Sequence, residues 1–109
     1  MYFYWDDWNR EHATSHGVSL AEIRFVVRRQ SSPDPTEVGN AKLRVWGPTG
    51  HGRLIQVIYS EISSERIHYD EMDFEDIIAF EVEVPPYIYV IHARDLTRDE
   101  KRLYHRRRR

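Results

Sequence analysis

Cysteine is absent from this chain. The absence excludes disulfide bonds and thiolate metal sites and suits a reducing cytoplasm, although by itself it leaves export open. The chain also lacks the run of about eighteen apolar residues that a membrane-spanning helix needs. Its opening, MYFYWDDWNR, has no basic region followed by the apolar core of a signal peptide. The sequence therefore predicts a cytoplasmic protein without a membrane anchor.

Net charge is small, at −2, but the charges are spread unevenly. Residues 1–60 carry seven basic and six acidic side chains, residues 61–84 carry one and nine, and residues 85–109 carry eight and three. A chain of 109 residues is one domain by length. The near-neutral total therefore combines an acidic segment with a basic C-terminal end, which can act separately or shield each other.

Two helices are expected near the N-terminus. Asp6 or Asp7 can cap the first, which we expect to end at Gly17. Ser19 and Glu22 form a Ser-x-x-Glu capping box that starts the second. One face of the first helix bears aromatic and histidine residues at helical spacing: Trp8, His12 and Ser15 or His16. The second has an apolar stripe: Leu20, Ile23, Val26 and Val27. The pattern predicts a helical hairpin.

Runs rich in β-branched and aromatic residues predict four strands: residues 2–5, 42–46, 53–60 and 87–93. Residues 47–52 contain three glycines and read as a turn, so the second and third strands are expected to form an antiparallel hairpin. Between residues 61 and 84, an acidic helix from about Asp73 and a further strand can extend this hairpin or form a separate lobe. In the last strand, alternation places four residues on one face: Ile88, Val90, His92 and Arg94.

A basic helix is expected after the last strand. Thr97 and Glu100 form a Thr-x-x-Glu capping box at its start. Half of the cationic residues of the chain lie in its last sixteen positions: Arg94, Arg98, Lys101, Arg102 and Arg106 to Arg109. This concentration of charge indicates an anionic polymer as partner.

Several short motifs occur in order along residues 2–60 and 87–105: Trp5-Asp6, His16-Gly17-Val18-Ser19 with Glu22, Gly52-Arg53-Leu54, and Ile91-His92-Ala93-Arg94 followed by Thr97, Glu100 and Tyr104. Their order and placement resemble the BrnT family of bacterial toxins. The resemblance implies an α+β, RelE-like fold, with an N-terminal helical hairpin and a C-terminal helix packed on a small antiparallel β-sheet. Residues 1–109 would form one BrnT-like domain with an atypical acidic insertion at about 61–84.

The resemblance also implies a function. It implies a metal-independent endoribonuclease that inhibits translation, acting as the toxin of a type II toxin–antitoxin pair in the cytoplasm. The expected partners are an RNA substrate and a BrnA-like antitoxin protein that also represses the operon. Within that complex the toxin can dimerise.

The chain departs from the family pattern in three places. His12 and Ser15 stand where the family usually has asparagine and lysine, His92 stands where serine is usual, and residues 61–84 replace a short turn. These departures favour a second hypothesis, in which the chain is a catalytically inactive BrnT-like module that binds protein or RNA.

A ribonuclease of this kind needs a base, an acid and cations at the phosphate. Arg53 and Arg94 are the candidate cations, although both can simply end strands on a solvated face. His16 can transfer protons or only cap its helix. Tyr104 can donate a proton or stack on a base, or anchor its helix to the sheet. Further contacts to RNA are expected from His92, Arg98 and Arg102.

No cofactor or metal is expected. His12 and His16 are four residues apart, a spacing that can hold zinc. The His-Glu-x-x-His pattern is absent and no third ligand is evident, so the two histidines do not indicate a metal site.

Overall fold

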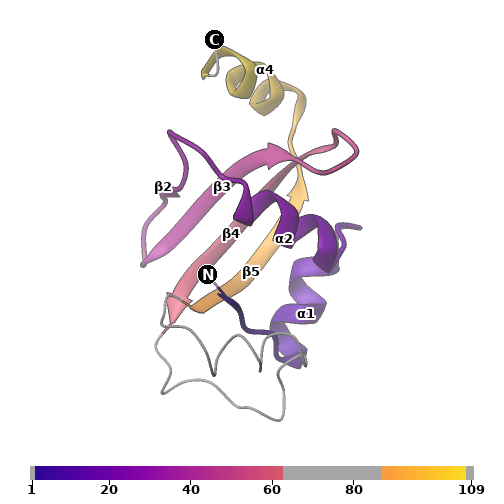
Figure 1. Ribbon diagram of the computed structural model, residues 1–109, viewed down its shortest axis with the longest axis vertical. Coiled ribbons are helices and arrows are strands. Elements are labelled where there is room, and N and C mark those ends of the chain that lie inside the picture. The colour runs from indigo at the N-terminus through magenta and orange to yellow at the C-terminus, as the bar shows by residue number, and fades with distance from the viewer. Residues whose placement is uncertain (1, 63–86, 108–109) are drawn as a thin grey trace.

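The computed structural model describes residues 2–62 and 87–107, so most of the predicted acidic insertion at 61–84 lies outside the described residues. It is an α+β domain with two N-terminal helices, a five-stranded mixed sheet and a C-terminal helix (Figure 1). The elements in chain order are β1 (Tyr2–Phe3), α1 (Asp7–Thr14), α2 (Leu20–Arg28), β2 (Thr36–Glu37), β3 (Lys42–Pro48), β4 (Leu54–Ile62), β5 (Tyr87–Asp95) and α4 (Arg98–Arg107).

The strands lie in the order β1-β5-β4-β3-β2. The predicted hairpin is confirmed as β3 and β4, which pair antiparallel from Lys42 opposite Ser60 to Pro48 opposite Leu54. The prediction of a wholly antiparallel sheet is wrong at one edge, because β1 pairs with β5 in parallel. A parallel pair needs a long crossover, and here the chain between the two strands includes the helical hairpin and three strands. The two-residue β2 was not predicted within a loop rich in turn-forming residues.

A bulge in β5 changes which of its residues face the core. Consecutive residues of β4 pair with Val90 and His92, so Ile91 is an extra residue in the strand. Simple alternation predicts Val90 and His92 on one face, and this prediction is wrong. Val90 and Ala93 are both fully buried in the main core, whereas His92 is only half-buried. His92 and Arg94, both beyond the bulge, still share a face.

The predicted cap of α1 is Asp6, which forms a capping box with Asn9 that was not predicted, and the predicted Ser19 and Glu22 capping box of α2 is confirmed. The Asp6 side chain accepts from the Asn9 N–H and the Asn9 side chain accepts from the Asp6 N–H. Ser19 and Glu22 exchange the same pair of bonds at the start of α2, at 3.1 and 3.0 Å. Local hydrogen bonding of this kind is encoded within four residues, which is why the sequence predicts it well.

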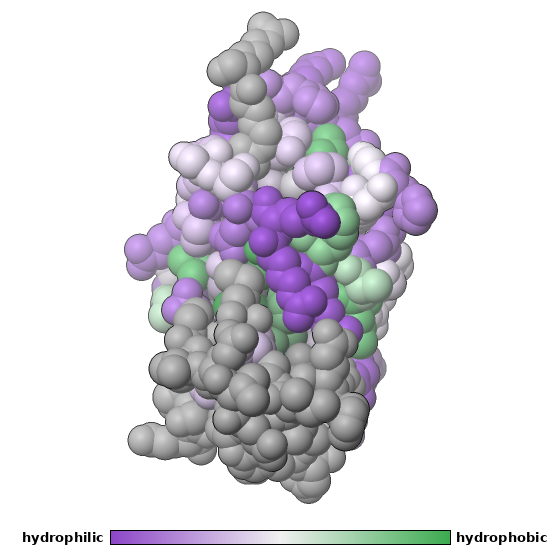
Figure 2. All heavy atoms as spheres, in the orientation of Figure 1, coloured by the Kyte–Doolittle hydropathy of each residue, from purple (hydrophilic) through white to green (hydrophobic). Residues whose placement is uncertain are grey.

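The helices cover one face of the sheet. In Figure 1, α2 crosses in front of the strands and α1 lies beside β5. Beneath them lies a core built from all the longer elements except α4: Phe3, Trp5, Ala13, Val18, Ile23, Val26, Val27, Val45, Ile55, Val57, Tyr59, Ile88, Val90 and Ala93. The outer surface of α2 is hydrophilic, as Figure 2 shows at the centre of the view. Arg24 and Arg28 belong to this helix, and Arg29 is its C-cap.

The C-terminal helix lies at the opposite end of the sheet from α1 (Figure 1). Its predicted capping box is confirmed, since Thr97 N–H donates to Glu100 at 2.8 Å and Glu100 N–H donates to the Thr97 hydroxyl at 3.2 Å. Tyr104 of α4 is buried in a small cluster with Trp46 and Leu96. None of the helices within the described ranges is long and apolar enough to cross a membrane.

Candidate active site

The structure brings two of the candidate residues into contact. The rings of His16 and His92 lie edge to face, with centroids 4.8 Å apart and planes at 63°. His92 comes from β5, whereas His16 lies in the turn between the helices, because α1 ends at Thr14 and not at Gly17 as expected. Gly17 makes this turn with a φ of +78°, a conformation that glycine adopts without strain. The exposed His16 ring therefore reaches the sheet from a turn and not from a helix end.

His92 is suited to accept a proton. Its pKa is lowered from 6.5, chiefly because burial disfavours the charged form, and further by the nearby charges of His16 and Arg94. The imidazole is therefore mostly neutral at pH 7. A neutral imidazole beside a second, exposed histidine is an arrangement that can move a proton in each direction.

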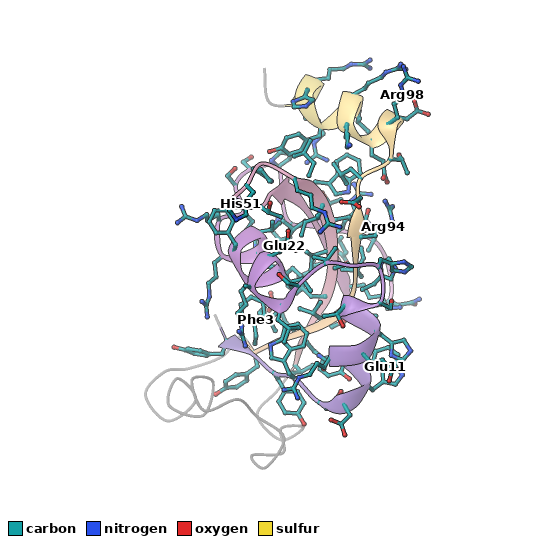
Figure 3. All side chains as sticks on the ribbon, turned by 90° about the vertical axis from the view of Figure 1, so that its right-hand side faces the viewer. Phe3, Glu11, Glu22, His51, Arg94 and Arg98 are labelled. Atoms are coloured by element: carbon teal, nitrogen blue, oxygen red, sulfur yellow. The ribbon has the colours of Figure 1, made fainter. Side chains whose placement is uncertain are left out.

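Arg94 lies beside His92 on the same face of β5 and is held by a carboxylate. Its guanidinium donates two hydrogen bonds to Glu100, at 2.7 and 2.9 Å, and one to the Asp95 carbonyl at 2.9 Å. The hydrogen bonds to Glu100 and the charge of that carboxylate raise the pKa of Arg94 and keep it charged. Figure 3 shows Arg94 near the end of the sheet, below α4 and its Arg98. The ion pair thus joins the candidate site to the first turn of α4.

This ion pair is expected to appear in the acid stability of the protein. Glu100 has a pKa lowered from 4.5 to about 2, first by its bond from Arg94 and further by the bonds from Thr97. Its contribution is complete above pH 4.5 and is lost as pH falls toward about 2. After discounting for solvent screening, we expect Glu100→Gln to remove about 1–2 kcal/mol of that pH-dependent stability.

Urea unfolding at pH 7 and pH 3 measures this effect. Glutamine keeps an acceptor for the Thr97 N–H, so the helix cap survives the change. Asp99→Asn is the matched control. The Asp99 side chain is 90% exposed, and its ion pair with Arg102 is long, at 3.6 Å, so its removal should change stability little. Equal pH dependence in wild type and Glu100→Gln would show that the pair contributes nothing to acid stability.

Arg53 occupies a separate ion pair. It donates to both carboxylate oxygens of Asp95, at 2.5 and 3.1 Å, to the Gly17 carbonyl at 3.0 Å and to Glu22 at 3.3 Å. Adjacent residues of a strand point to opposite faces, so Asp95 and Arg94 direct their partners to opposite sides of β5. The two arginines that the sequence suggested for one phosphate site therefore stand in different networks. Arg53 therefore links three parts of the fold: the turn at Gly17, the Ser19 and Glu22 capping box, and the end of β5.

The remaining candidates lie on α4. Tyr104 is buried against Trp46 and Leu96, so it anchors its helix to the sheet. Arg98 and Arg102 are exposed, and Arg102 has a weak contact of 3.6 Å with Asp99. The two basic side chains are therefore accessible, whereas the tyrosine is part of the packing.

The acidic partners Asp95 and Glu100 were not singled out as site residues from the sequence. Each forms an ion pair with one of the candidate arginines. Glu100 carried a signal, since a capping-box glutamate lies at a predictable place in the first turn of a helix. Asp95 carried none beyond its position next to Arg94.

In residues 2–62 and 87–107, no three histidine, aspartate or glutamate side chains gather as a metal site would require. A cavity of about 240 Å³ lies between α2, β3 and α4, where Phe25, Trp46 and Tyr104 contribute to its walls. It does not include His16 or His92. His16 is exposed and His92 is half-buried, so the histidine pair lies at the protein surface.

Comparisons with models of protein families, with curated proteins and with solved structures find no match to this chain.

Proposed function

We propose that this protein is a metal-independent endoribonuclease in which His16 and His92 transfer protons beside Arg94. The contact between the two imidazoles is the observation that carries the proposal. Cleavage of RNA by its own 2′-hydroxyl requires removal of one proton and delivery of another, and histidine can do both near neutral pH. A neighbouring cation is needed for the charge that develops on the phosphate.

The roles follow from the two environments. Neutral His92 accepts the proton of the 2′-hydroxyl, whose oxygen attacks the phosphorus and forms a 2′,3′-cyclic phosphate. The bond to the 5′-oxygen breaks, and His16 donates the proton that this leaving oxygen takes up. The two rings touch in the free protein, so the exposed His16 ring has to rotate away when the phosphate enters.

Arg94 supplies the cation for the phosphate. Its guanidinium already bonds Glu100 twice, so RNA binds by sharing or displacing that carboxylate. The exposed Arg98 and Arg102 add sequence-independent attraction for the RNA backbone.

The biological role that we propose is that of a toxin in a bacterial type II toxin–antitoxin pair, as the BrnT-like motifs imply. The observed succession of strand, two helices, strands and C-terminal helix agrees with the order that this resemblance implies, and it supports a RelE-like arrangement as part of the proposal. The partner would be a BrnA-like antitoxin. Its binding would cover the histidine pair or the basic surface of α4.

Induced expression in a bacterial host tests this role. We expect wild type to arrest growth, and the double change His16→Ala with His92→Gln to remove the arrest at equal protein level. Co-expression of an antitoxin encoded beside the gene should restore growth. Growth of the wild-type strain at the rate of the double variant would refute the toxin proposal.

A second candidate function has one observation in its favour. Arg53 and Arg94 each hold a carboxylate, so neither presents an unoccupied guanidinium to a phosphate. This arrangement suits an inactive module that binds RNA or protein through the basic α4. Filter binding with intact-RNA recovery separates the two: saturable, salt-sensitive binding without cleavage would favour the module.

A further inference from the structure

Four aromatic rings form a column between α1 and the edge of β5. Trp8 stacks on His12, with centroids 3.9 Å apart and planes at 18°, and lies nearly parallel to Tyr89 at 6.4 Å. Tyr89 stacks on Tyr4 at 6.0 Å. We call Tyr4, Tyr89, Trp8 and His12 the aromatic column. Trp8 is 49% exposed and His12 is also exposed, so the column opens to solvent at this end.

The column is held in place by polar contacts. The Tyr89 hydroxyl donates to the carboxylate of Asp6, the cap of α1, at 2.9 and 3.1 Å. His12 Nδ1 lies 2.7 Å from the Trp8 carbonyl. A carbonyl can only accept, so this nitrogen carries the proton and the imidazole is fixed over the indole. Rings held in this way need little further ordering when a ligand stacks on them.

Two rings of the column lie on α1, the helix that leads into the turn carrying His16. Trp8, His12 and His16 are four residues apart, and Trp8 and His12 follow one face of α1. His12 lies in the last turn of α1, which ends at Thr14, and His16 follows in the turn directly after the helix. A single-stranded nucleic acid with a phosphate at the histidine pair can therefore place a neighbouring base at the column.

We infer that the aromatic column is a stacking platform for a nucleobase flanking the phosphate bound at His16 and His92. Trp8 keeps 49% of its surface exposed although His12 stacks on it, so the indole and the imidazole together present an ordered aromatic surface to a planar base. Stacking on aromatic side chains does not require a particular base, so the platform serves single-stranded RNA with little sequence preference. The orientation of the strand rests on the proposed function, whereas the stacking itself can be measured without cleavage.

Tryptophan fluorescence reports directly on this platform. Of the three tryptophans, Trp5 is 0% and Trp46 is 3% exposed, so quenching by an added base acts mainly on Trp8. The probe is a short 2′-deoxyadenylate oligonucleotide, which lacks the attacking hydroxyl and cannot be cleaved by the proposed route. A strand of equal length without bases is its comparison. We expect saturable quenching by the first and little by the second.

Substitutions then measure the contribution of the ring. Trp8→Ala should weaken binding of the deoxyadenylate probe about 5- to 100-fold, as measured by fluorescence anisotropy of a labelled strand, and leave binding of the baseless strand unchanged. Trp8→Phe keeps an aromatic ring and should retain most of the affinity. Leu103→Ala is the matched control, because Leu103 is 43% exposed but lies on α4.

Equal quenching by the two strands, or unchanged affinity in Trp8→Ala, would overturn the inference. Loss of antitoxin binding in Trp8→Ala with unchanged affinity for the probe would assign the column to protein contact instead. Base-dependent quenching in a protein that leaves RNA intact would keep the platform and remove the nuclease proposal. Normal cleavage of RNA by Trp8→Ala, with an unchanged KM, would remove the platform and keep the nuclease proposal.

Discussion

His92→Gln is expected to lower the rate of RNA cleavage at least about 100-fold, the usual loss when a general base is removed. Glutamine keeps a polar side chain at this half-buried position but cannot take the proton of the 2′-hydroxyl. The loss should appear in kcat, because proton transfer belongs to the transition state and not to RNA binding. Single-turnover cleavage of a fluorescent RNA, with binding measured separately, gives both quantities.

His51→Gln is the matched control for this prediction. His51 is exposed in the turn between β3 and β4, and Figure 3 labels it on a different element from Arg94. We expect its cleavage rate to equal that of wild type. Cleavage by His92→Gln at the control rate, in a protein with unchanged circular dichroism, would remove His92 from the chemistry.

Asn9→Ala is expected to destabilise the fold by about 2–3 kcal/mol, which would lower Tm by roughly 10 °C in a domain of this size. Asn9 is 0% exposed. Its side chain accepts from the Asp6 N–H at 2.8 Å and donates to the Tyr4 carbonyl at 3.0 Å. Alanine removes both bonds, one from a helix cap and one from a buried carbonyl. Thermal and urea unfolding measure the loss.

Glu11→Ala provides the comparison on the same helix. Glu11 is exposed and lies on α1, where Figure 3 labels it. A surface change of this kind should stay within about 0.5 kcal/mol of wild type. If Asn9→Ala unfolds at the same urea concentration as Glu11→Ala, the buried amide does not stabilise α1 as its hydrogen bonds indicate.

Features encoded by neighbouring residues could be predicted from the sequence. The Ser19 and Glu22 capping box, the Thr97 and Glu100 box and the β3–β4 hairpin all depend on side chains and turns within a few positions of one another. The apolar stripe of α2 was also identified, because its burial follows directly from helical spacing. The sequence therefore predicted most helices and strands.

Features that depend on distant parts of the chain could not be predicted. The parallel pairing of β1 joins Tyr2 to Tyr87, and alternation alone does not show that Ile91 is an extra residue in β5. Strand alternation after the bulge determines which face each site residue occupies. An unseen bulge therefore alters the predicted surroundings of His92 although the strand itself is predicted.

The sequence named the individual candidate residues but not their arrangement. His16 and His92 were both chosen from the sequence, yet their contact depends on how the turn after α1 meets β5. The ion pairs of Arg53 and Arg94 with their carboxylates likewise depend on tertiary packing. Trp8 and His12 were assigned to one helix face, but the addition of Tyr89 to their column needs the sheet.

Cleavage of RNA by the purified protein in the presence of a chelator tests the nuclease proposal most directly. We predict products with a 2′,3′-cyclic phosphate at one end and a 5′-hydroxyl at the other, because the proposed attacking group is the 2′-hydroxyl. The double variant His16→Ala with His92→Gln, prepared identically, should leave the RNA intact. Intact RNA with wild type, or equal cleavage by the double variant, would contradict the account.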